Sequence, residues 1–246
     1  MSGILPLGPY QKDDPFAPPG QTLQPQFTVG RAIVFHRNHP GWREACRPIF
    51  LGTRPRTTLS AMTIRPHDNC YWVIPGRLLA GEYPGAADKK RARERLTDIA
   101  AAGVRQFLDL TEPHELAPYA PHLAPLSRML DRPLAHERWP IRDRDIPHTF
   151  GYSNQILDRM DDLLAAAVVP YVHCWGGVGR TGTIVGCWLV RHGHSGEQAL
   201  AQLADWWDTV AKNDRHPRSP ETDAQRQFVR EWAQHDRVRR VAAAAP

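Results

Sequence analysis

Residues 168–183 have the sequence Val168-Val169-Pro170-Tyr171-Val172-His173-Cys174-Trp175-Gly176-Gly177-Val178-Gly179-Arg180-Thr181-Gly182-Thr183. The first five residues are apolar and mostly β-branched, as in a buried strand, and Pro170 predicts imperfect pairing or a strand that starts after it. Three glycines within the next loop precede an apolar run of helical length. A strand, a glycine-rich loop and a helix start predict an oxyanion site made of backbone N–H groups at the positive end of the helix.

Two side chains make this predicted loop chemically reactive. Cys174 opens it and Arg180 closes it, with five residues between them. The N–H dipoles and the guanidinium favour the thiolate of Cys174, which is then a nucleophile against a bound phosphate. Arg180 offers a planar fork for two phosphate oxygens, and the hydroxyl of Thr181 can donate to the sulfur when the thiolate leaves. The alternative is a buried structural cysteine before a glycine turn.

The frame His173-Cys174, five residues, Arg180-Thr181-Gly182 resembles the signature of cysteine-dependent protein tyrosine phosphatases, in the dual-specificity-like form. The resemblance covers roughly residues 68–234. It implies a phosphate monoester hydrolase that forms a phosphocysteine and uses neither a cofactor nor a metal. The residues that would bind the phosphate are those of the loop, Trp175, Gly176, Gly177, Val178, Gly179 and Arg180.

Hydrolysis of a phosphate monoester also needs a proton donor for the leaving oxygen, which a thiolate cannot supply. In the resembled family this donor is an Asp on a mobile loop, a few tens of residues before the cysteine. Asp143 lies 31 positions before Cys174 and is the favoured general acid, and Asp145 is the rival. The alternative is that both carboxylates only pair with neighbouring arginines on a solvated loop.

Two further polar residues are candidates for the site. For His173 the resemblance implies hydrogen bonds that organise the loop, and proton transfer with Cys174 is the alternative. Gln225 lies in a segment that resembles the one which, in some phosphatases, orients the water of the second step. Pro220 and Thr222 also fit an ordinary helix start, so a purely capping role is favoured for this segment.

The remaining cysteines are Cys46, Cys70 and Cys187. Cys187 is predicted to lie in the core, because it falls on an apolar helix. A reversible disulfide from Cys174 to Cys70 or Cys46 would protect the thiolate from over-oxidation. No spacing of Cys and His is typical of a zinc site.

Composition is consistent with a large folded domain in a reducing cytoplasm: 246 residues, 41% hydrophobic and 23% charged, with four cysteines. Neither an apolar run of membrane-spanning length nor a secretory signal is visible, so no membrane association is predicted. The net charge of +5 favours anionic substrates. No interleaving of basic and aromatic residues predicts nucleic-acid binding, and nothing indicates an oligomeric state.

Strands alternate with helices from about residue 68, which predicts an α/β fold with a central, mostly parallel sheet flanked by helices on both sides. The predicted strands are 69–74, 77–81, 104–110, 134–140 and 168–172, and the predicted helices are 86–102, 116–130 in part, 150–167, 181–192, 196–210 and 222–238. We assign 68–240 to the catalytic domain and 241–246 to a disordered tail. Residues 1–67 are predicted to be a tail and extension of unknown role, with possible strands at 27–29 and 31–35.

Substrate choice is the least determined part of the prediction. Phosphotyrosine, phosphoserine or phosphothreonine, phosphoinositides and nucleotide phosphates all fit such a loop. Phosphoinositide-selective loops often carry extra lysines, and 175–179 has none, which favours a phosphorylated protein. A phosphatase of non-protein substrates, a catalytically silent phosphate-binding module and a sulfur-transfer enzyme are the alternatives. The combination of Cys174, Arg180 and Asp143 argues against the silent module.

Overall fold

A five-stranded sheet organises the domain. The computed structural model describes residues 64–244, with side chains described as far as residue 236. The sheet order is β1-β2-β5-β3-β4, and only the β1–β2 pair is antiparallel. The strands are β1 (Cys70–Ile74), β2 (Leu78–Gly81), β3 (Gln106–Asp109), β4 (Ala135–Arg138) and β5 (Pro170–His173). The predicted mostly parallel α/β sheet is therefore confirmed.

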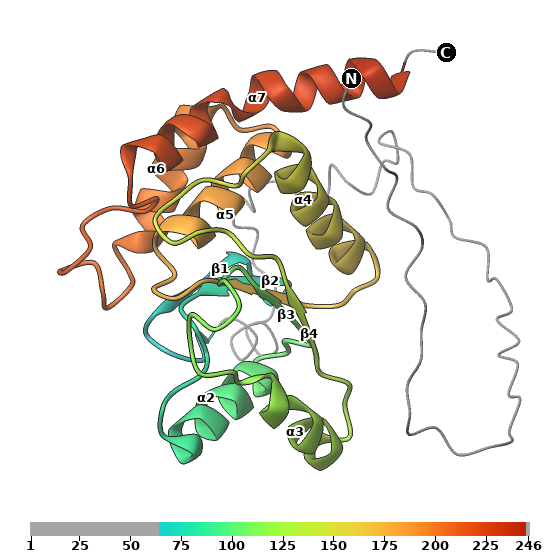
Figure 1. The fold of residues 1–246 in the computed structure, drawn as a ribbon, viewed down its shortest axis with the longest axis vertical. Coiled ribbons are helices and arrows are strands. Elements are labelled where there is room, and N and C mark those ends of the chain that lie inside the picture. The colour runs from blue at the N-terminus through green and yellow to red at the C-terminus, as the bar shows by residue number, and fades with distance from the viewer. Residues whose placement is uncertain (1–63, 245–246) are drawn as a thin grey trace, which may run out of the picture. The chain divides into compact units, whose positions relative to one another are not determined.

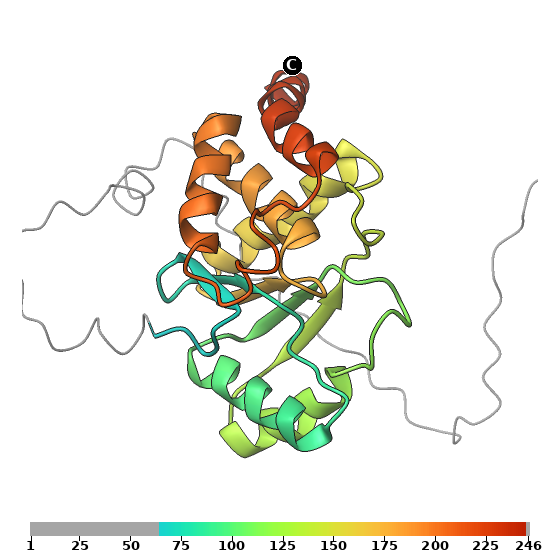
Figure 2. The same cartoon turned by 90° about the vertical axis from the view of Figure 1, so that its left-hand side faces the viewer.

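Helices cover both faces of this sheet (Figure 1). One face carries α2 (Lys89–Ala101), a short 3₁₀ turn η1 (Ala120–His122) and α3 (Leu123–Leu130). The other face carries α4 (Phe150–Ala165), α5 (Gly179–Arg191), α6 (Gly196–Trp207) and α7 (Asp223–Ala244). Figure 2 shows the same two layers from the side.

Each face has its own hydrophobic core, and β3 contributes to both. Phe107 packs with α2 and α3, where Ile99 and Leu126 are buried, whereas Leu108 packs with Ile156 of α4 and the core around α5. Neighbouring residues of a strand point to opposite faces of a sheet, so this division follows directly from the two apolar residues in sequence. Helices on both faces hold the sheet rigid below the loops that leave its edge.

The carboxyl ends of three parallel strands meet at one edge of the sheet. The backbone of β3 is in register with β5 from Gln106↔Pro170 to Asp109↔His173, and with β4 from Gln106↔Ala135 onward. In open parallel sheets, ligands bind beyond the carboxyl ends of the strands. The segments after β3, β4 and β5 are therefore those that the fold gathers around a site.

The structure shifts several predicted boundaries. β5 begins at Pro170, because proline is tolerated as the first residue of a strand, where no ladder N–H is required of it. α7 continues to Ala244, so the tail predicted at 241–246 is helical up to that residue, which suits a run of alanines, the strongest helix formers. None of the described helices is both long and apolar enough to cross a membrane.

Residues next to the predicted domain boundary pack onto the domain. Arg65 donates from Nη1 to the carbonyl of Thr209 at 2.7 Å, and His67 Nε2 lies 3.2 Å from the hydroxyl of Tyr171. The boundary at residue 68 stays a prediction, but these contacts tie Arg65 and His67 to the segment after α6 and to the sheet. The strands predicted at 27–29 and 31–35 lie outside the described residues.

Candidate active site

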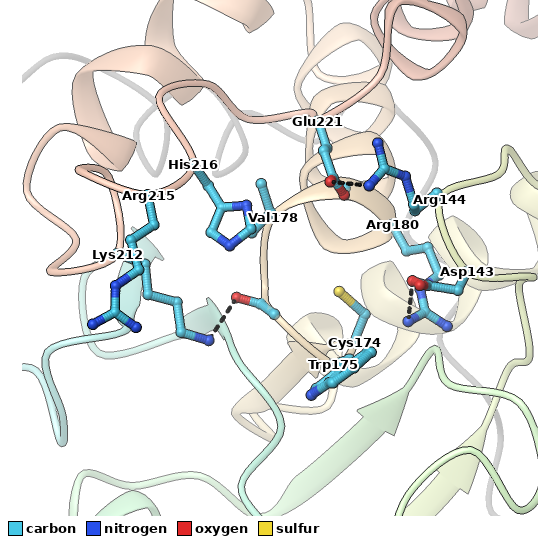
Figure 3. Close-up of a pocket in the computed structure, with 12 residues that line it drawn as sticks. Asp143, Arg144, Cys174, Trp175, Val178, Arg180, Lys212, Arg215, His216 and Glu221 are labelled. Carbon is cyan, nitrogen blue, oxygen red and sulfur yellow. Dashed lines mark hydrogen bonds and ion pairs between the residues drawn. The ribbon is translucent and has the colours of Figure 1, made fainter.

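The loop between β5 and α5 borders a cavity of about 400 Å³ (Figure 3). Cys174 comes directly after β5, and α5 begins at Gly179, two residues before the predicted start of this helix. Every residue from Cys174 to Arg180 lines the cavity except Gly177. Trp175, 56% exposed, stands at the mouth, and its carbonyl accepts a hydrogen bond from the N–H of Tyr83 at 2.9 Å.

Gly177 faces the end of β2 and has no room for a side chain. Its φ is +75°, in the left-handed region, and a Cβ there would lie 2.5 Å from the carbonyl carbon of Gly81 and 2.7 Å from the N of Glu82. Both the backbone angle and the contact require glycine. Glycine in this loop therefore allows close packing on β2, in addition to the open side that faces the cavity.

Arg180 is held in one position by ionic contacts on one side of the cavity. Its guanidinium forms a two-pronged pair with Glu115, Nη2–Oε1 2.6 Å and Nη1–Oε2 2.7 Å, and Nη1 also donates to the carbonyl of Ile141 at 3.0 Å. Only 1% of its surface is exposed. Burial alone would lower the pKa of Arg180, but the hydrogen bonds that it donates to Glu115 outweigh burial and raise the pKa above its ordinary value. The fork is therefore a fixed cation.

The two rival aspartates occupy different positions. Asp143 lines the cavity, and its Oδ1 lies 2.8 Å from Nη2 of Arg180. Asp145 is exposed and outside the lining, and its Oδ1 accepts the N–H of Ile146 at 2.8 Å. Neither aspartate forms an ion pair with an adjacent arginine in the part of the chain described; Arg144 pairs with Glu221 instead, at 3.3 Å. The geometry thus favours Asp143 over Asp145 as the carboxylate near the sulfur.

His173 is completely buried behind the loop. Its Nε2 lies 2.6 Å from the hydroxyl of Tyr119, and its carbonyl accepts the N–H of Leu110, directly after β3, at 2.8 Å. Burial lowers the pKa of His173 to about 4, although the nearby carboxylate of Asp109 opposes the shift. A neutral imidazole fixed among aromatic rings suits the predicted organising role better than proton transfer to Cys174.

Gln225 and Thr222 cap α7 reciprocally. The N–H of Gln225 donates to Thr222 Oγ1 at 3.2 Å, and the N–H of Thr222 donates to Gln225 Oε1 at 3.0 Å, the arrangement of a capping box. Gln225 Nε2 also donates to the carbonyl of Asp145 at 3.0 Å. The side chain is fully buried and does not line the cavity, so its observed contacts are those of a residue that joins α7 to the loop of the aspartates.

The cysteine positions bear on the disulfide hypothesis. Cys70 pairs with Gly81, which in turn pairs with His173, so Cys70 and Cys174 are separated by two strand spacings, about 9–10 Å. Disulfides require Cα atoms within about 7 Å, so this pairing would need backbone movement. Burial also raises the pKa of the Cys70 thiol to about 12. Cys187 is fully buried, as predicted, and Cys46 lies outside the described residues.

Two features of the site were not predicted from the sequence. Glu115, which holds Arg180, follows β3, and the rule that ligands bind beyond the carboxyl ends of parallel strands could have indicated that segment. Lys212, Arg215 and His216 reach the cavity from the loop between α6 and α7. No local motif marks them.

The buried Thr181 hydroxyl makes no hydrogen bond to any described residue. Among the same residues, no group of three metal-ligating side chains occurs.

Comparison with known families agrees with this geometry. The model of the family described as "PTP-SAK: Swiss Army Knife protein, DSP-PTPase phosphatase domain" matches residues 67–229, two thirds of the chain. The chain belongs to this family. The PTP-SAK match therefore confirms the resemblance to dual-specificity-like phosphatases, and it identifies the domain as that of a cysteine phosphatase. No curated protein matches the chain.

Solved structures show the same fold. A mutant form of Tk-PTP is 23% identical and aligns over 69% of this chain and 97% of its own, with a TM-score of 0.51. Kinase associated phosphatase, with its catalytic cysteine replaced by serine, is 22% identical over 69% and 89%, with a TM-score of 0.51. TpbA from P. aeruginosa, in complex with phosphotyrosine, is 15% identical over 74% and 94%, also with a TM-score of 0.51. At such identities the likeness concerns the fold alone.

Proposed function

We propose that this PTP-SAK domain hydrolyses phosphate monoesters through a phosphocysteine intermediate. The observation that carries the proposal is the convergence of Cys174, Arg180 and Asp143 on one cavity: the first two come from the β5–α5 segment, and the third comes from the segment after β4. A nucleophile, a fixed cation and a carboxylate are the groups that in-line phosphoryl transfer to a protein requires. A reducing compartment such as the cytoplasm would keep the thiolate free.

In the first step, the thiolate of Cys174 attacks phosphorus opposite the ester oxygen. The S–P bond forms as the P–O bond to the leaving group breaks, and the developing charge on the equatorial oxygens is stabilised by the loop N–H groups and Arg180. The carboxylic acid form of Asp143 transfers its proton to the leaving oxygen. In the free enzyme the Asp143–Arg180 ion pair keeps both groups at the cavity, and the bound phosphate takes over the contacts of the arginine.

In the second step, water attacks the phosphocysteine. Asp143, now a carboxylate, accepts a proton from the water as the S–P bond breaks and inorganic phosphate forms. Thr181 stabilises the departing thiolate, since its buried hydroxyl has no other described hydrogen-bond partner. Gln225 positions the loop that carries Asp143, because its side chain ties this loop to α7.

The argument for a phosphoprotein substrate considered only one of the segments that line the cavity. That prediction rested on the lack of lysine in 175–179, yet Lys212, Arg215 and His216 line the same cavity from another loop. The proposed substrate class is therefore phosphate monoesters in general. A silent phosphate-binding module has no support in a site that keeps Cys174, Arg180 and Asp143 together.

Steady-state hydrolysis of para-nitrophenyl phosphate in EDTA, comparing the wild type with Cys174→Ser, tests the proposal. We expect activity in EDTA, inhibition by orthovanadate, and no turnover in Cys174→Ser. Cys70→Ser is the matched control, because it also removes a buried thiol but lies two strands away. Equal activity of Cys174→Ser and wild type, or an inactive but folded and reduced wild type, would contradict the proposal.

A further inference from the structure

The loop between α6 and α7 brings basic side chains to the catalytic cavity. Lys212, Arg215 and His216 line it from this loop, and Arg144 lines it from the segment of the aspartates. Figure 3 shows the three residues of the α6–α7 loop across the cavity from Asp143. None of them belongs to the phosphate loop, so the cavity has a second wall with its own chemistry.

Hydrogen bonds fix the backbone of this second wall. The N–H of Ala211 donates to the carbonyl of Asp68 at 3.1 Å, and Trp207 Nε1 donates to the carbonyl of His216 at 2.6 Å. At the other end of the loop, Ser219 Oγ donates to the carbonyl of Val178, in the phosphate loop, at 2.8 Å. The basic side chains therefore start from a backbone that is anchored both to the segment before β1 and to the catalytic loop.

The basic groups differ in how far they are neutralised. Lys212 forms an ion pair with Glu82 and donates to the carbonyl of Gly176 at 3.4 Å, and Arg144 pairs with Glu221. The side chains of Arg215 and His216 are exposed and have no ion-pair or hydrogen-bond partner among the described residues. Two solvent-exposed side chains with N–H donors thus line the cavity beside Arg180 without pairing with any described residue.

Arg218 shows that the lack of an ion-pair partner is not a general property of the basic residues in this loop. Only three residues beyond Arg215, it does not line the cavity, and its Nη1 pairs with Asp223 Oδ1 at 2.9 Å. An arginine of the same loop that does not line the cavity pairs with a carboxylate, whereas the cavity-lining Arg215 does not pair with any described residue. Arg215 and His216 are therefore available to bind an anionic group in the cavity.

We propose that the substrate is a multiply phosphorylated small molecule, whose second phosphate binds Arg215 and His216 while Cys174 attacks the first. The inference rests on the proposed phosphatase activity and names its substrate class. A cavity of about 400 Å³ is within the range of small-molecule sites, and both walls belong to it, so the two phosphates must lie close together. Adjacent side chains of an extended peptide point in opposite directions, which disfavours a doubly phosphorylated peptide.

The test compares inositol 1-phosphate with inositol 1,4,5-trisphosphate, which carries phosphates on adjacent carbons. The measured quantity is the ratio of kcat/KM for the trisphosphate to kcat/KM for the monophosphate. We expect the double variant Arg215→Gln/His216→Gln to lower this ratio about tenfold or more, chiefly through KM, since a hydrogen bond to a charged group contributes more than a neutral one. Arg218→Gln, the matched control, should leave the ratio unchanged. An unchanged ratio in the double variant would overturn the proposal.

Two further arms identify the source of the second phosphate. Vesicles containing phosphatidylinositol 4,5-bisphosphate present the same phosphate pattern on a lipid, and faster hydrolysis of either the soluble or the vesicle form than of inositol 1-phosphate supports the proposal. A preference for a doubly phosphorylated peptide over both would overturn it. Calorimetric binding of the trisphosphate to Cys174→Ser, with and without Arg215→Gln, tests the second phosphate site without turnover. If para-nitrophenyl phosphate is not hydrolysed, the proposed function fails as well, whereas normal hydrolysis with an unchanged ratio removes this inference alone.

Discussion

The β5–α5 loop and the α6–α7 loop border one cavity, yet they are built in opposite ways. Cys174 and Arg180 are almost completely buried, and the loop between them packs so closely on β2 that Gly177 admits no side chain. Arg215 and His216 are exposed, and only their backbone is anchored. In the proposed mechanism, the chemistry uses the wall whose geometry is fixed, whereas the proposed second phosphate binds the wall that can change without disturbing the fold.

The largest effect should come from removing the proton donor. Asp143→Asn is expected to lower kcat about 10²–10⁴-fold for esters with poor leaving groups, because the leaving oxygen then receives no proton. For para-nitrophenyl phosphate, whose leaving group needs less help, the loss should be smaller. Asp145→Asn is the matched control, since that carboxylate lies outside the cavity lining. Larger losses in Asp145→Asn than in Asp143→Asn would reverse the assignment.

Exchanging arginine for lysine on each wall compares them directly. Arg180→Lys should lower kcat/KM about 10²–10³-fold, because the two-pronged geometry that Glu115 fixes is lost although the charge remains. Arg215→Lys keeps the charge at an exposed position and should cost less than about tenfold against inositol 1,4,5-trisphosphate. Steady-state kinetics with that substrate measures both. Equal losses would show that the two walls do not differ in the way their burial indicates.

Glycine substitutions separate backbone strain from close packing. Gly177→Ala should lower the free energy of unfolding by about 2–4 kcal/mol, because a Cβ overlaps β2 at a positive φ, and it should also impair hydrolysis. At Gly103 φ is also positive, +107°, but a Cβ meets nothing within 4 Å, so Gly103→Ala should cost only about 1–2 kcal/mol. Urea denaturation measures both. A Gly177→Ala protein as stable as Gly103→Ala would contradict the packing described for the loop.

Acid should destabilise the folded protein through His173. Burial lowers its pKa to about 4 from an ordinary 6.5, so between these values the unfolded chain binds a proton that the folded protein excludes. Its contribution to stability is complete above about pH 6.5 and is lost as the pH falls toward 4, amounting to about 2 kcal/mol between pH 7 and pH 5. The nearby Asp109 is ionised throughout this range, because hydrogen bonds from His136 and Thr111 outweigh burial and lower its pKa.

Urea denaturation of wild type and His173→Gln at pH 7 and pH 5 checks this expectation. The loss of stability on acidification should be smaller in the variant, even though its stability at pH 7 is reduced. Burial also lowers the pKa of His67 to about 4, so that residue contributes to acid sensitivity in both proteins and cancels in the comparison. Identical losses in the two proteins would show that His173 takes up its proton in the folded state.

The contrast between the two walls also explains how much could be predicted. Cys174 and Arg180 lie in one contiguous segment, where strand, glycine loop and helix follow each other, so local chemistry predicted the order of the elements and the candidate residues, although β5 and α5 begin and end at other residues than predicted. The general acid was narrowed to two neighbouring aspartates, and tertiary structure was needed to see which one reaches the cavity. Residues 1–63 lie outside the described structure, so the extension and its role stay predictions.

Other residues carried no local signal at all. Glu115 contacts Arg180 across 65 positions of sequence, and Tyr119 contacts His173 across 54, so neither pairing follows from any motif. Arg215 and Arg218 are both arginines of the same loop, and nothing in the sequence distinguishes them. Only the path of the loop determines which of them lines the cavity. The prediction of a phosphoprotein substrate therefore rested on residues 175–179 alone, because the sequence did not reveal that the α6–α7 loop also lines the cavity.

The central claim, that Cys174 is the phosphorylated nucleophile, is tested most directly by trapping the intermediate. Asp143→Asn enzyme mixed with para-nitrophenyl phosphate and quenched in acid within a turnover should retain phosphate on the peptide that contains Cys174, detected by mass spectrometry. The same experiment with Cys174→Ser should show none. Phosphate on another residue, or burst-free hydrolysis with no labelled peptide, would contradict the account.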